Sequence, residues 1–383
     1  MRVLEITYTW PPETFIVRHA EALARYMPID LIIGARSPAK PQSASIQPSV
    51  PLGYKSLILP NFDHLSLPKK IYLSLKSLKY VDRINRSQWN YRERVVMDYI
   101  ERTSPDLVHF HTSSLAVMMS NYLEAIGIPY TMSLRGKDIQ VLPIVERGYL
   151  EKLCQVASSA KAIHTVVDAF SSQLHELCDT HFICTTIRTC IPQNFFQRNQ
   201  PSGNGVDIRF ISVGRLHWTK AFDDLVRAIA LLPPNLSLDI VGDGPEHEYL
   251  SYLVDSLGLM DRVYLHGNLP FSEFHSLLTS ATAYVQSSVT EGFSNALAEA
   301  MAMGLPVFVT DAGGTSEIIQ DGQNGYLIPV GDPRGIAEIL TKAQSSDNLE
   351  KIGNAAYTTA LREFEPERHA VSFFEFYQIA IAK

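Results

Sequence analysis

Cysteine is scarce in this chain, with four residues among 383. They are Cys154, Cys178, Cys184 and Cys190, and no two of them form the C-x2-C pair that structural zinc sites commonly use. The last three recur every six residues, a spacing that matches no zinc-ligand pattern. We therefore expect four free, buried thiols in a protein of the reducing cytosol.

Long apolar runs are absent as well. No stretch approaches the roughly 18 residues that a membrane-spanning helix needs, and the first residues predict a strand rather than the apolar core of a signal peptide. Repeats and low-complexity tracts are also missing. The net charge is −7 and no nucleic-acid-binding signature is visible, so no nucleic acid partner is expected.

The chain is long, and strand patterns alternate with helix patterns along it. At 383 residues it exceeds the roughly 250–300 at which single cores stop growing, so we expect two α/β domains. Short apolar runs between helical patterns predict two sets of parallel strands. The first set is 2–8, 30–33, 106–111, 130–134 and 162–166, and the second is 209–213, 237–241, 263–266, 283–286 and 306–309. The polar stretch 192–205, rich in Gly, Pro and Asn, is the predicted linker.

The most informative stretch is 288–304, in which Glu291 and Glu299 stand eight residues apart. A Gly–Phe–Ser–Asn turn separates them, with Ser294 or Asn295 as the N-cap of a helix that begins near Asn295. Unpaired backbone N–H groups at the start of that helix make an anion site. The two carboxylates can therefore hold the two ends of a nucleotide-sugar whose diphosphate lies at the helix N-terminus.

A second segment points to the same ligand. The predicted strand 209–213 leads into Gly214, and the loop beyond it carries Arg215 and Lys220. Such a loop lies at the carboxyl edge of a parallel sheet, where ligands of this class bind. Arg215 can bind phosphate oxygens bidentately, and Lys220 can add a point charge beside them.

Together these two segments resemble the E-x7-E and G-R-L…K-G motifs of retaining glycosyltransferases of family 4, which have the GT-B fold. Ala221 stands here where the family usually has a glycine after the lysine. The resemblance covers nearly the whole chain. It implies two doubly wound, Rossmann-like domains facing across a cleft. An acceptor-binding domain would span 1–198 and a nucleotide-sugar-binding domain 199–365, with a last helix, 366–383, that packs back on the first domain.

The resemblance also implies roles for single residues. Arg215 and Lys220 would neutralise the leaving diphosphate. Glu291 would orient hydroxyl groups of the donor sugar, and Glu299 would hold the ribose. With His111 from the first domain, Arg215, Lys220 and Glu291 form the predicted catalytic set. The other predicted donor-binding residues are Gly214, Gly267, Asn268, Leu269, Gly292, Phe293, Ser294, Asn295 and Ala296.

In the family, the acceptor attacks from the front face and the leaving phosphate can take its proton, so no carboxylate nucleophile is needed. The sequence has no D-x-D carboxylate pair for a divalent metal, and neither a metal nor another cofactor is expected. Gly242 and Gly244 begin a G-x-G, but His247 stands where a dinucleotide fingerprint needs its third glycine. This argues against a nicotinamide cofactor.

The first domain would face the acceptor. Its predicted strand 106–111 carries His109 and His111 on one face. The segment resembles the family's D-x-x-H-x-H, whose second histidine approaches the donor sugar. The resemblance therefore places His111 in the active-site cleft, and His109 is expected to pack in the core.

Two further loops are predicted to contact the acceptor. Glu13 and Thr14 follow the first strand, in a Pro-Pro-Glu-Thr-Phe variant similar to that of members that build bacterial exopolysaccharide or lipopolysaccharide. Arg135 and Lys137 occupy the place where relatives often carry His-Gly-x-Asp. Alternatively, Glu13 is only a favourable charge in a first helical turn, and Asp138 only caps the helix after a glycine turn.

Charge is divided unevenly along the chain. Residues 1–200 hold 22 Lys and Arg against 17 Asp and Glu, a balance of +5, whereas the rest hold 11 against 23, a balance of −12. Much of the positive charge lies in 68–102, a predicted helical stretch interleaved with aromatic and aliphatic residues. This stretch either lies on an anionic membrane surface or is an ordinary solvated helix face. We expect a cytoplasmic protein that, in the first case, is peripheral at the inner face of the membrane.

These observations predict a retaining glycosyltransferase of the hexosyltransferase type. It would move a sugar from a nucleotide-sugar to a sugar or lipid-linked acceptor, in cell-envelope polysaccharide or glycolipid synthesis. Two alternatives stay open. A GT-B-fold nucleotide-sugar epimerase would isomerise the donor without any acceptor, and a catalytically silent protein would bind the donor without turning it over.

Overall fold

The computed structural model describes residues 1–7, 14–27, 29–34, 55–59, 91–197, 208–344 and 346–382. The chain divides into two units. Unit 1 comprises Met1–Val166, Phe170–Cys190 and Glu367–Lys383, and unit 2 comprises Val167–Ala169 and Ile191–Pro366. The division in the middle of the chain thus comes at Ile191, ahead of the boundary predicted after residue 198.

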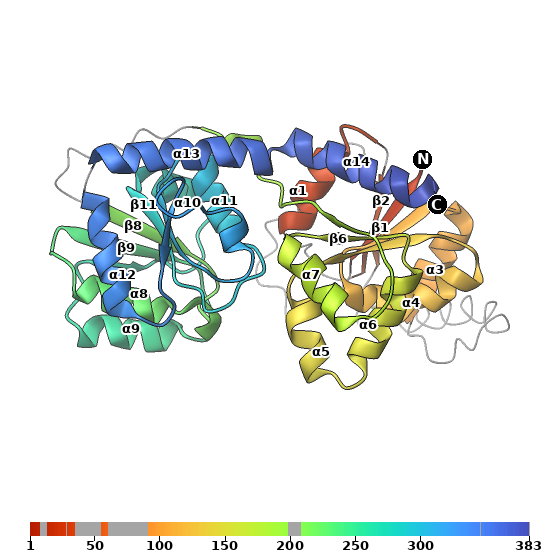
Figure 1. Cartoon of the computed structure of the whole chain (residues 1–383), viewed down its shortest axis with the longest axis horizontal. Helices are drawn as coiled ribbons and strands as arrows, with labels where there is room; N and C mark the ends of the chain where they lie inside the picture. Colours follow the sequence, from red (N-terminus) through yellow and green to blue (C-terminus); the bar gives the residue numbers. More distant parts are fainter. Residues whose placement is uncertain are drawn as a thin grey trace, which may run out of the picture. The chain divides into compact units, whose positions relative to one another are not determined.

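The sheet of unit 1 is parallel, and its seven described strands run in the order β3-β2-β1-β4-β5-β6-β7 (Figure 1). They are β1 (Val3–Thr7), β2 (Ile29–Gly34), β3 (Lys55–Leu59), β4 (Leu107–Phe110), β5 (Tyr130–Leu134), β6 (Ala162–Thr165) and β7 (Cys184–Thr186). The strand order reverses between β1 and β4, where Glu5 pairs with His109. In a doubly wound sheet, ligand sites form beside the carboxyl ends of strands at such a point.

The helices of unit 1 come from both ends of the chain. They are α1 (Thr14–Leu23), α3 (Tyr91–Thr103), α4 (Ser113–Ala125), α5 (Leu142–Val145), α6 (Tyr149–Ser159), α7 (Asp168–Leu177) and α14 (Pro366–Ala382). Helix α14 packs Phe373, Phe376 and Tyr377 into a core cluster that includes Val3 and Leu23. The N-terminus lies near the end of this helix (Figure 1).

The sheet of unit 2 repeats the same topology with six described strands, in the order β10-β9-β8-β11-β12-β13. They are β8 (Ile208–Val213), β9 (Leu236–Val241), β10 (Val263–Leu265), β11 (Ala283–Gln286), β12 (Val307–Thr310) and β13 (Tyr326–Ile328). The pairings between these six strands are parallel, and the order reverses between β8 and β11.

Helices cover both faces of this second sheet. They are α8 (Phe222–Ala230), α9 (His247–Ser256), α10 (Phe271–Ser280), α11 (Asn295–Ala302), α12 (Pro333–Leu340) and α13 (Ser346–Phe364). Successive side chains of a strand point to opposite faces. Phe210 accordingly joins the core cluster with α8, α9 and α12, whereas Ile211 joins the cluster with α10, α11 and α13. The strands are buried on both sides, as parallel sheets require.

The predicted class, an α/β protein with two doubly wound sheets, is confirmed. Each of the ten predicted strands is present, with ends within one residue over the described part of the chain. The sequence prediction missed β3, β7 and β13, which lie at sheet edges. Two of these have only three residues, too short for an alternating pattern to be recognised.

The predicted linker and the predicted basic helix are only partly described. Residues 192–197 of the linker belong to unit 2, where Phe195 is fully buried with its ring centroid 5.6 Å from that of Phe271. This part is therefore packed core rather than a free connection. Of the stretch 68–102, residues 68–90 lie outside the described part, and the rest falls in α3.

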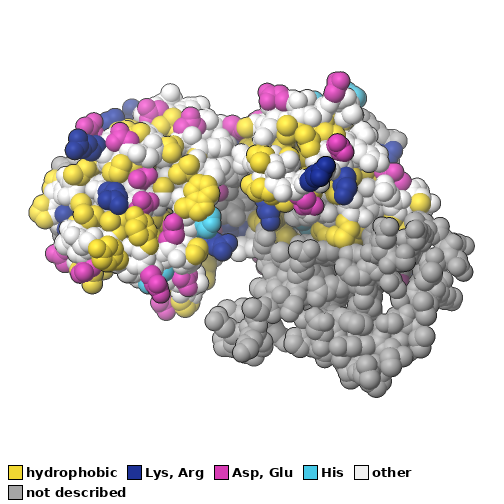
Figure 2. Space-filling model, turned by 90° about the horizontal axis from the view of Figure 1, so that it is seen from below, with side chains coloured by type: hydrophobic (Ala, Val, Ile, Leu, Met, Phe, Trp, Pro, Cys, Tyr) yellow, Lys and Arg dark blue, Asp and Glu magenta, His cyan; other side chains and the backbone are white. Residues whose placement is uncertain are grey.

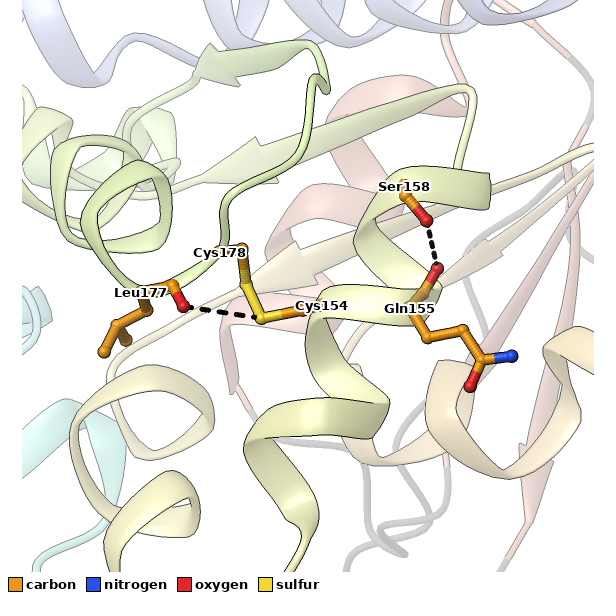
Figure 3. Close-up of a disulfide and its surroundings, with 5 residues drawn as sticks. All are labelled: Cys154, Gln155, Ser158, Leu177 and Cys178. Atoms are coloured by element: carbon orange, nitrogen blue, oxygen red, sulfur yellow. Dashed lines mark hydrogen bonds between the residues drawn. A yellow bond between two sulfur atoms is a disulfide. The ribbon is translucent and has the colours of Figure 1, made fainter.

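The cysteine prediction was wrong for one pair. Cys154 of α6 and Cys178, directly after α7, form a disulfide (Figure 3). The two helices bring the Cα atoms to 5.3 Å although 24 positions separate the residues in sequence, so no local spacing pattern could have revealed the bond. Cys184 and Cys190 remain thiols, and burial raises the pKa of Cys190 to about 12.

None of the described helices is both long and apolar enough to cross a membrane. On the face seen in Figure 2, the side chains of Lys and Arg are interspersed with those of Asp and Glu among apolar ones. The coloured side chains of this face therefore form no region of one sign.

Candidate active site

The candidate site in unit 2 lies at the switch point between β8 and β11. The loops that follow β8, β11 and β12 are joined there by hydrogen bonds. Val289 N–H donates to the Thr219 carbonyl at 2.9 Å, and the Ser287 hydroxyl lies 2.9 Å from the Lys220 carbonyl. The Thr310 hydroxyl donates to the Ser288 carbonyl at 2.7 Å. The loops that carry the predicted catalytic residues of this unit are therefore held as one structure.

Lys220 and Glu291 form an ion pair across these loops. Their side chains are 21% and 15% exposed, so water screens this pair less than a surface pair. The Ser288 hydroxyl also lies 3.4 Å from the Glu291 carboxylate. Arg215, on the same loop as Lys220, is exposed. The structure thus brings two of the predicted catalytic residues into direct contact.

Backbone segments approach closely at this edge of the sheet. Gly313 has a φ of 61°, and a Cβ atom there would lie 1.7 Å from the Glu291 carbonyl oxygen. Gly242 has a φ of 134°, and its Cβ would lie 1.9 Å from the Gly214 carbonyl oxygen. Only glycine fits either position, and this lets the loops around Gly214 and Glu291 come together.

Helix α11 begins at Asn295, as predicted, and Ser294 is its N-cap. The Ser294 hydroxyl accepts a hydrogen bond from Leu297 N–H at 3.2 Å, which satisfies one of the N–H groups at the helix start. Gly292, Phe293, Asn295 and Ala296 surround this terminus and are half-buried. The start of this helix and its cap are thus those that the sequence predicted, and the anion site there stays a prediction.

A hollow of about 480 Å³ opens beside the carboxyl ends of β8 and β9. Arg215, Asn268, Leu269 and Glu299, all predicted to contact the donor, contribute to its wall. Glu299 is 6% exposed and lies in the second turn of α11. The remaining lining residues are Val213, Gly214, Val241, Gly242, Asp243 and Phe274. Gly267 directly precedes Asn268 in the chain, and its carbonyl accepts a hydrogen bond from Gly242 N–H at 2.9 Å.

In unit 1, His111 follows directly after β4 and is fully buried. Its Nε2 lies 3.1 Å from a carboxylate oxygen of Glu5. Burial lowers the pKa of His111 to about 4, against the opposing effect of the Glu5 hydrogen bond and charge. His109 packs in the core, as expected, with Thr131 at 2.8 Å and Ser133 at 3.0 Å from its ring nitrogens.

The predicted acceptor-side residues are placed in part. Glu13 lies outside the described residues, and Thr14 is the exposed first residue of α1. Arg135, after β5, is half-buried with its guanidinium carbon 3.9 Å from the centroid of the Phe15 ring, a cation–π contact. Lys137 is exposed.

Asp138 caps a different helix from the one suggested by the sequence. Its carboxylate accepts hydrogen bonds from Ser113 N–H at 3.0 Å and from the Ser113 hydroxyl at 2.7 Å, at the start of α4. It also accepts from Arg135 N–H at 3.2 Å. Burial raises the pKa of Asp138 despite these bonds. The residue therefore ties the loop after β5 to the helix after β4.

Two polar residues escaped the sequence analysis. Glu5 lies inside the buried strand β1 with no exposed surface, and a lone carboxylate within an apolar strand is a signal that could have been used. Gln286 ends β11 beside the site and is 4% exposed. Its Nε2 has no hydrogen-bond partner among the described residues.

The carboxylate of Glu5 and ring nitrogens of His19 and His111 lie within 4.8 Å of one another, a set able to hold a metal ion.

Comparison with known proteins agrees with this geometry. HepE of Anabaena, in a crystal structure with UDP, matches the fold with a TM-score of 0.77 at 18% identity, covering 99% of this chain and 100% of that one. The chain is thus an α/β protein of the GT-B fold. Residues 193–359 match the family model described as glycosyl transferases group 1.

Two sequence relatives extend the match into unit 1. TuaC of Bacillus subtilis, named as a teichuronic acid biosynthesis glycosyltransferase, is 26% identical over 288 residues, which cover 72% of this chain and 70% of that protein. The N-acetyl-alpha-D-glucosaminyl L-malate synthase of Bacillus anthracis is 27% identical over 282 residues, which cover 70% of this chain and 73% of that protein.

Proposed function

We propose that this protein is a retaining glycosyltransferase that moves a sugar from a nucleotide-sugar to a sugar or lipid-linked acceptor in cell-envelope polysaccharide or glycolipid synthesis. The observation that carries the proposal is the hollow beside the ends of β8 and β9, with Glu299 of α11 in its wall and the Lys220–Glu291 ion pair in the loops after β8 and β11. A nucleotide-sugar has a ribose, an anionic diphosphate and a sugar, and this site offers a partner for each.

The names of similar proteins support the same class of donor and product. Structures of HepE are described in complex with UDP and with UDP-glucose. TuaC is named for the synthesis of a cell-envelope polymer, teichuronic acid. We therefore propose a nucleoside diphosphate sugar as the donor and a growing polysaccharide or glycolipid as the acceptor.

In the proposed reaction, the bond between the anomeric carbon and the diphosphate oxygen breaks. The acceptor hydroxyl oxygen bonds to that carbon on the same face, and its proton passes to the leaving diphosphate. Negative charge on the diphosphate grows as the bond breaks, and Arg215, Lys220 and the N-terminus of α11 stabilise it. Glu291 orients the donor sugar and positions Lys220 through their ion pair.

Substitution of the two cations tests this role. We expect Lys220→Ala and Arg215→Ala each to lower turnover at least tenfold, because a charge-assisted contact that strengthens in the transition state is lost, at a cost of about 2–3 kcal/mol. The matched control is Arg334→Ala, an exposed cation of α12 in the same unit, which should keep the wild-type rate. Wild-type turnover in folded Lys220→Ala would remove the assignment.

Product analysis separates the proposal from its competitors. A nuclear magnetic resonance spectrum of the product should retain the anomeric configuration of the donor sugar. Isomerised donor in the absence of acceptor would identify an epimerase instead, and an unchanged donor with every acceptor would identify a silent binding protein. Activity should persist after treatment with EDTA, because the proposed chemistry uses only side-chain and backbone charges.

We also propose that the protein works at the cytoplasmic face of a membrane, held there by the basic stretch 68–102. Each Lys or Arg near an anionic surface can add about 1 kcal/mol of binding. Sedimentation with anionic vesicles at low and high salt tests this, with Lys69/Lys70/Lys76/Lys79→Glu as the comparison. Wild-type protein that ignores the vesicles at low salt would favour a solvated helix face and a soluble acceptor.

A further inference from the structure

The ion pair between Lys220 and Glu291 engages two side chains that the proposed reaction assigns to a ligand. The pair joins the loops that follow β8 and β11, and its side chains are only 21% and 15% exposed. Besides Lys220, the described residues give the Glu291 carboxylate one further neighbour, the Ser288 hydroxyl at 3.4 Å. Because water reaches neither charge freely, each depends on the other for its compensation.

Lys220 lies next to the hollow without lining it. The wall of the hollow includes Gly214, and a Cβ atom on Gly214 would lie 3.4 Å from Lys220 Cε and 3.6 Å from its Cδ. The aliphatic stem of Lys220 thus passes over the wall, while its ammonium is turned to Glu291. The Lys220 carbonyl is held by the Ser287 hydroxyl at 2.9 Å, so a change of partner falls to the flexible side chain.

A diphosphate in the hollow competes with Glu291 for this ammonium. Phosphate oxygens form charge-assisted hydrogen bonds with lysine, and the stem over Gly214 brings the ammonium within reach of the hollow by rotation of its last bonds. Such a rotation takes the ammonium away from Glu291. A poorly solvated carboxylate that loses its cation is costly unless other donors replace it.

A nucleoside diphosphate and a nucleotide-sugar differ in what they return to Glu291. Both can take the ammonium of Lys220, and in the proposed binding mode both hold their ribose at Glu299. The diphosphate then has no donor left for Glu291. The sugar of a nucleotide-sugar has hydroxyl groups, which donate to a carboxylate, so only the nucleotide-sugar replaces what Glu291 gives up.

We propose that Glu291, through its ion pair with Lys220, makes the site select the intact nucleotide-sugar over the nucleoside diphosphate that the reaction releases. This inference rests on the proposed function, in which Lys220 contacts the diphosphate and Glu291 the sugar. Specificity is a difference between two affinities, and the ion pair opposes both ligands while only one of them compensates. Once the sugar has been transferred, Glu291 takes back Lys220 and favours release of the diphosphate.

The opposite effect is expected if Lys220 binds both anions at once. An ammonium has three donors, and Glu291 would then only hold Lys220 ready for the phosphates. Loss of the charge on Glu291 would in that case weaken binding of the diphosphate. The ammonium lies beside the hollow rather than in its wall, and this favours exchange of partners over sharing.

Calorimetry without acceptor tests the sign of the effect in Glu291→Gln, which keeps the shape of the side chain and removes its charge. The probes are UDP with UDP-glucose and GDP with GDP-mannose, and the pair that raises the wild-type melting temperature more is used. We expect the variant to bind the diphosphate roughly threefold more tightly and the nucleotide-sugar roughly threefold more weakly. The ratio of the two dissociation constants then changes about tenfold.

The matched control is Asp243→Asn. Asp243 also lines the hollow, but its carboxylate accepts from Gly244 N–H at 2.7 Å and has no ion-pair partner among the described residues. Its neutralisation removes one negative charge from the same hollow and should change both affinities alike, with their ratio within about twofold of the wild type. A double-mutant cycle adds a second control, because Glu291→Gln in a Lys220→Gln background should leave affinity for the diphosphate unchanged.

The outcomes separate the inference from the proposed function. Affinity for the diphosphate that is unchanged or lower in Glu291→Gln contradicts the inference, and so does a ratio that moves no more than in Asp243→Asn. An equal gain in the Lys220→Gln background also contradicts it, since the effect would not pass through Lys220. Failure of the wild type to bind either pair of probes contradicts the proposed function itself, and the inference with it.

Discussion

Ala221 adopts a left-handed backbone conformation, with φ at 46°, directly after Lys220. An L-residue with a Cβ atom pays roughly 1–2 kcal/mol in this region, and glycine does not. Glycine loses more conformational freedom on folding, by about 0.5–1 kcal/mol. We therefore expect Ala221→Gly to raise the free energy of unfolding by about 0.5–1 kcal/mol, measured by urea denaturation.

The matched control for this prediction is Ala228→Gly. Ala228 lies inside α8, where the backbone is helical, so the same substitution should lower the free energy of unfolding by about 1 kcal/mol. Equal signs for the two variants would contradict the assignment of strain to position 221. The backbone conformation of the loop that carries Lys220 would then be set only by contacts with the surrounding residues.

Glu299 contributes a carboxylate to the wall of the hollow at α11. If it holds the ribose hydroxyls, Glu299→Ala should weaken binding of a nucleoside diphosphate roughly 10–100-fold, because hydrogen bonds to charged groups are worth about 1.5–3 kcal/mol. Calorimetry should use the diphosphate that gives the largest thermal shift with wild type. Glu248→Ala, an exposed carboxylate of α9, should bind as wild type does, and unchanged affinity in Glu299→Ala would remove the ribose role.

At the scale of elements, the disulfide joins α6 to the residue after α7. A closed loop of this length removes roughly 3 kcal/mol of chain entropy from the unfolded state. We expect Cys154→Ser to lower the free energy of unfolding by about that amount in buffer without reductant. In buffer with reductant the wild type should lose the same stability, and the two proteins should then unfold alike.

Cys184→Ser is the control for the disulfide, since Cys184 remains a thiol, and its stability should not depend on reductant. Thiol counting of denatured wild type should give two groups without reductant and four with it. Four thiols in freshly purified protein would place it in a reducing compartment with the bond open. Equal stability with and without reductant would contradict the entropic contribution.

At the scale of the whole molecule, buried neutral histidines make stability depend on pH. Burial lowers the pKa of His111 to about 4 and of His369 to about 3, and it holds the pKa of His109 and His164 well below the ordinary value. Below the unfolded pKa of about 6.5, the unfolded chain binds protons that the folded chain does not. Stability must then fall as pH falls from about 6.5 toward 4.

Glu5 affects the free energy of unfolding at lower pH than the histidines do. Its folded pKa lies well below the ordinary value, so its contribution is present above the unfolded pKa of about 4.3 and is lost as pH falls through the folded pKa. Between pH 7.5 and 5.5 each neutral histidine costs about 1.4 kcal/mol, so the four together should lower the free energy of unfolding by roughly 5–6 kcal/mol. Urea denaturation at both pH values measures this, and a flat profile would mean that the four histidines are hydrated or charged.

The sequence by itself determined the elements and the local chemistry of the unit 2 site. Apolar runs placed ten strands within one residue, because burial on both faces of a parallel sheet demands continuous apolar segments. The turn before Asn295 predicted where α11 begins, since capping is a local interaction. The spacing of Glu291 and Glu299 and the cations after β8 likewise lie within short segments that a pattern can reveal.

The tertiary structure decided what depends on residues far apart in the chain. The bond between Cys154 and Cys178 exists because α6 and α7 pack together. His111 gained its partner Glu5 because β1 and β4 are neighbours at the switch point, more than one hundred residues apart in sequence. Hydrogen bonds and burial of this kind arise only when the chain folds back on itself, and no local pattern records which distant side chain will complete them.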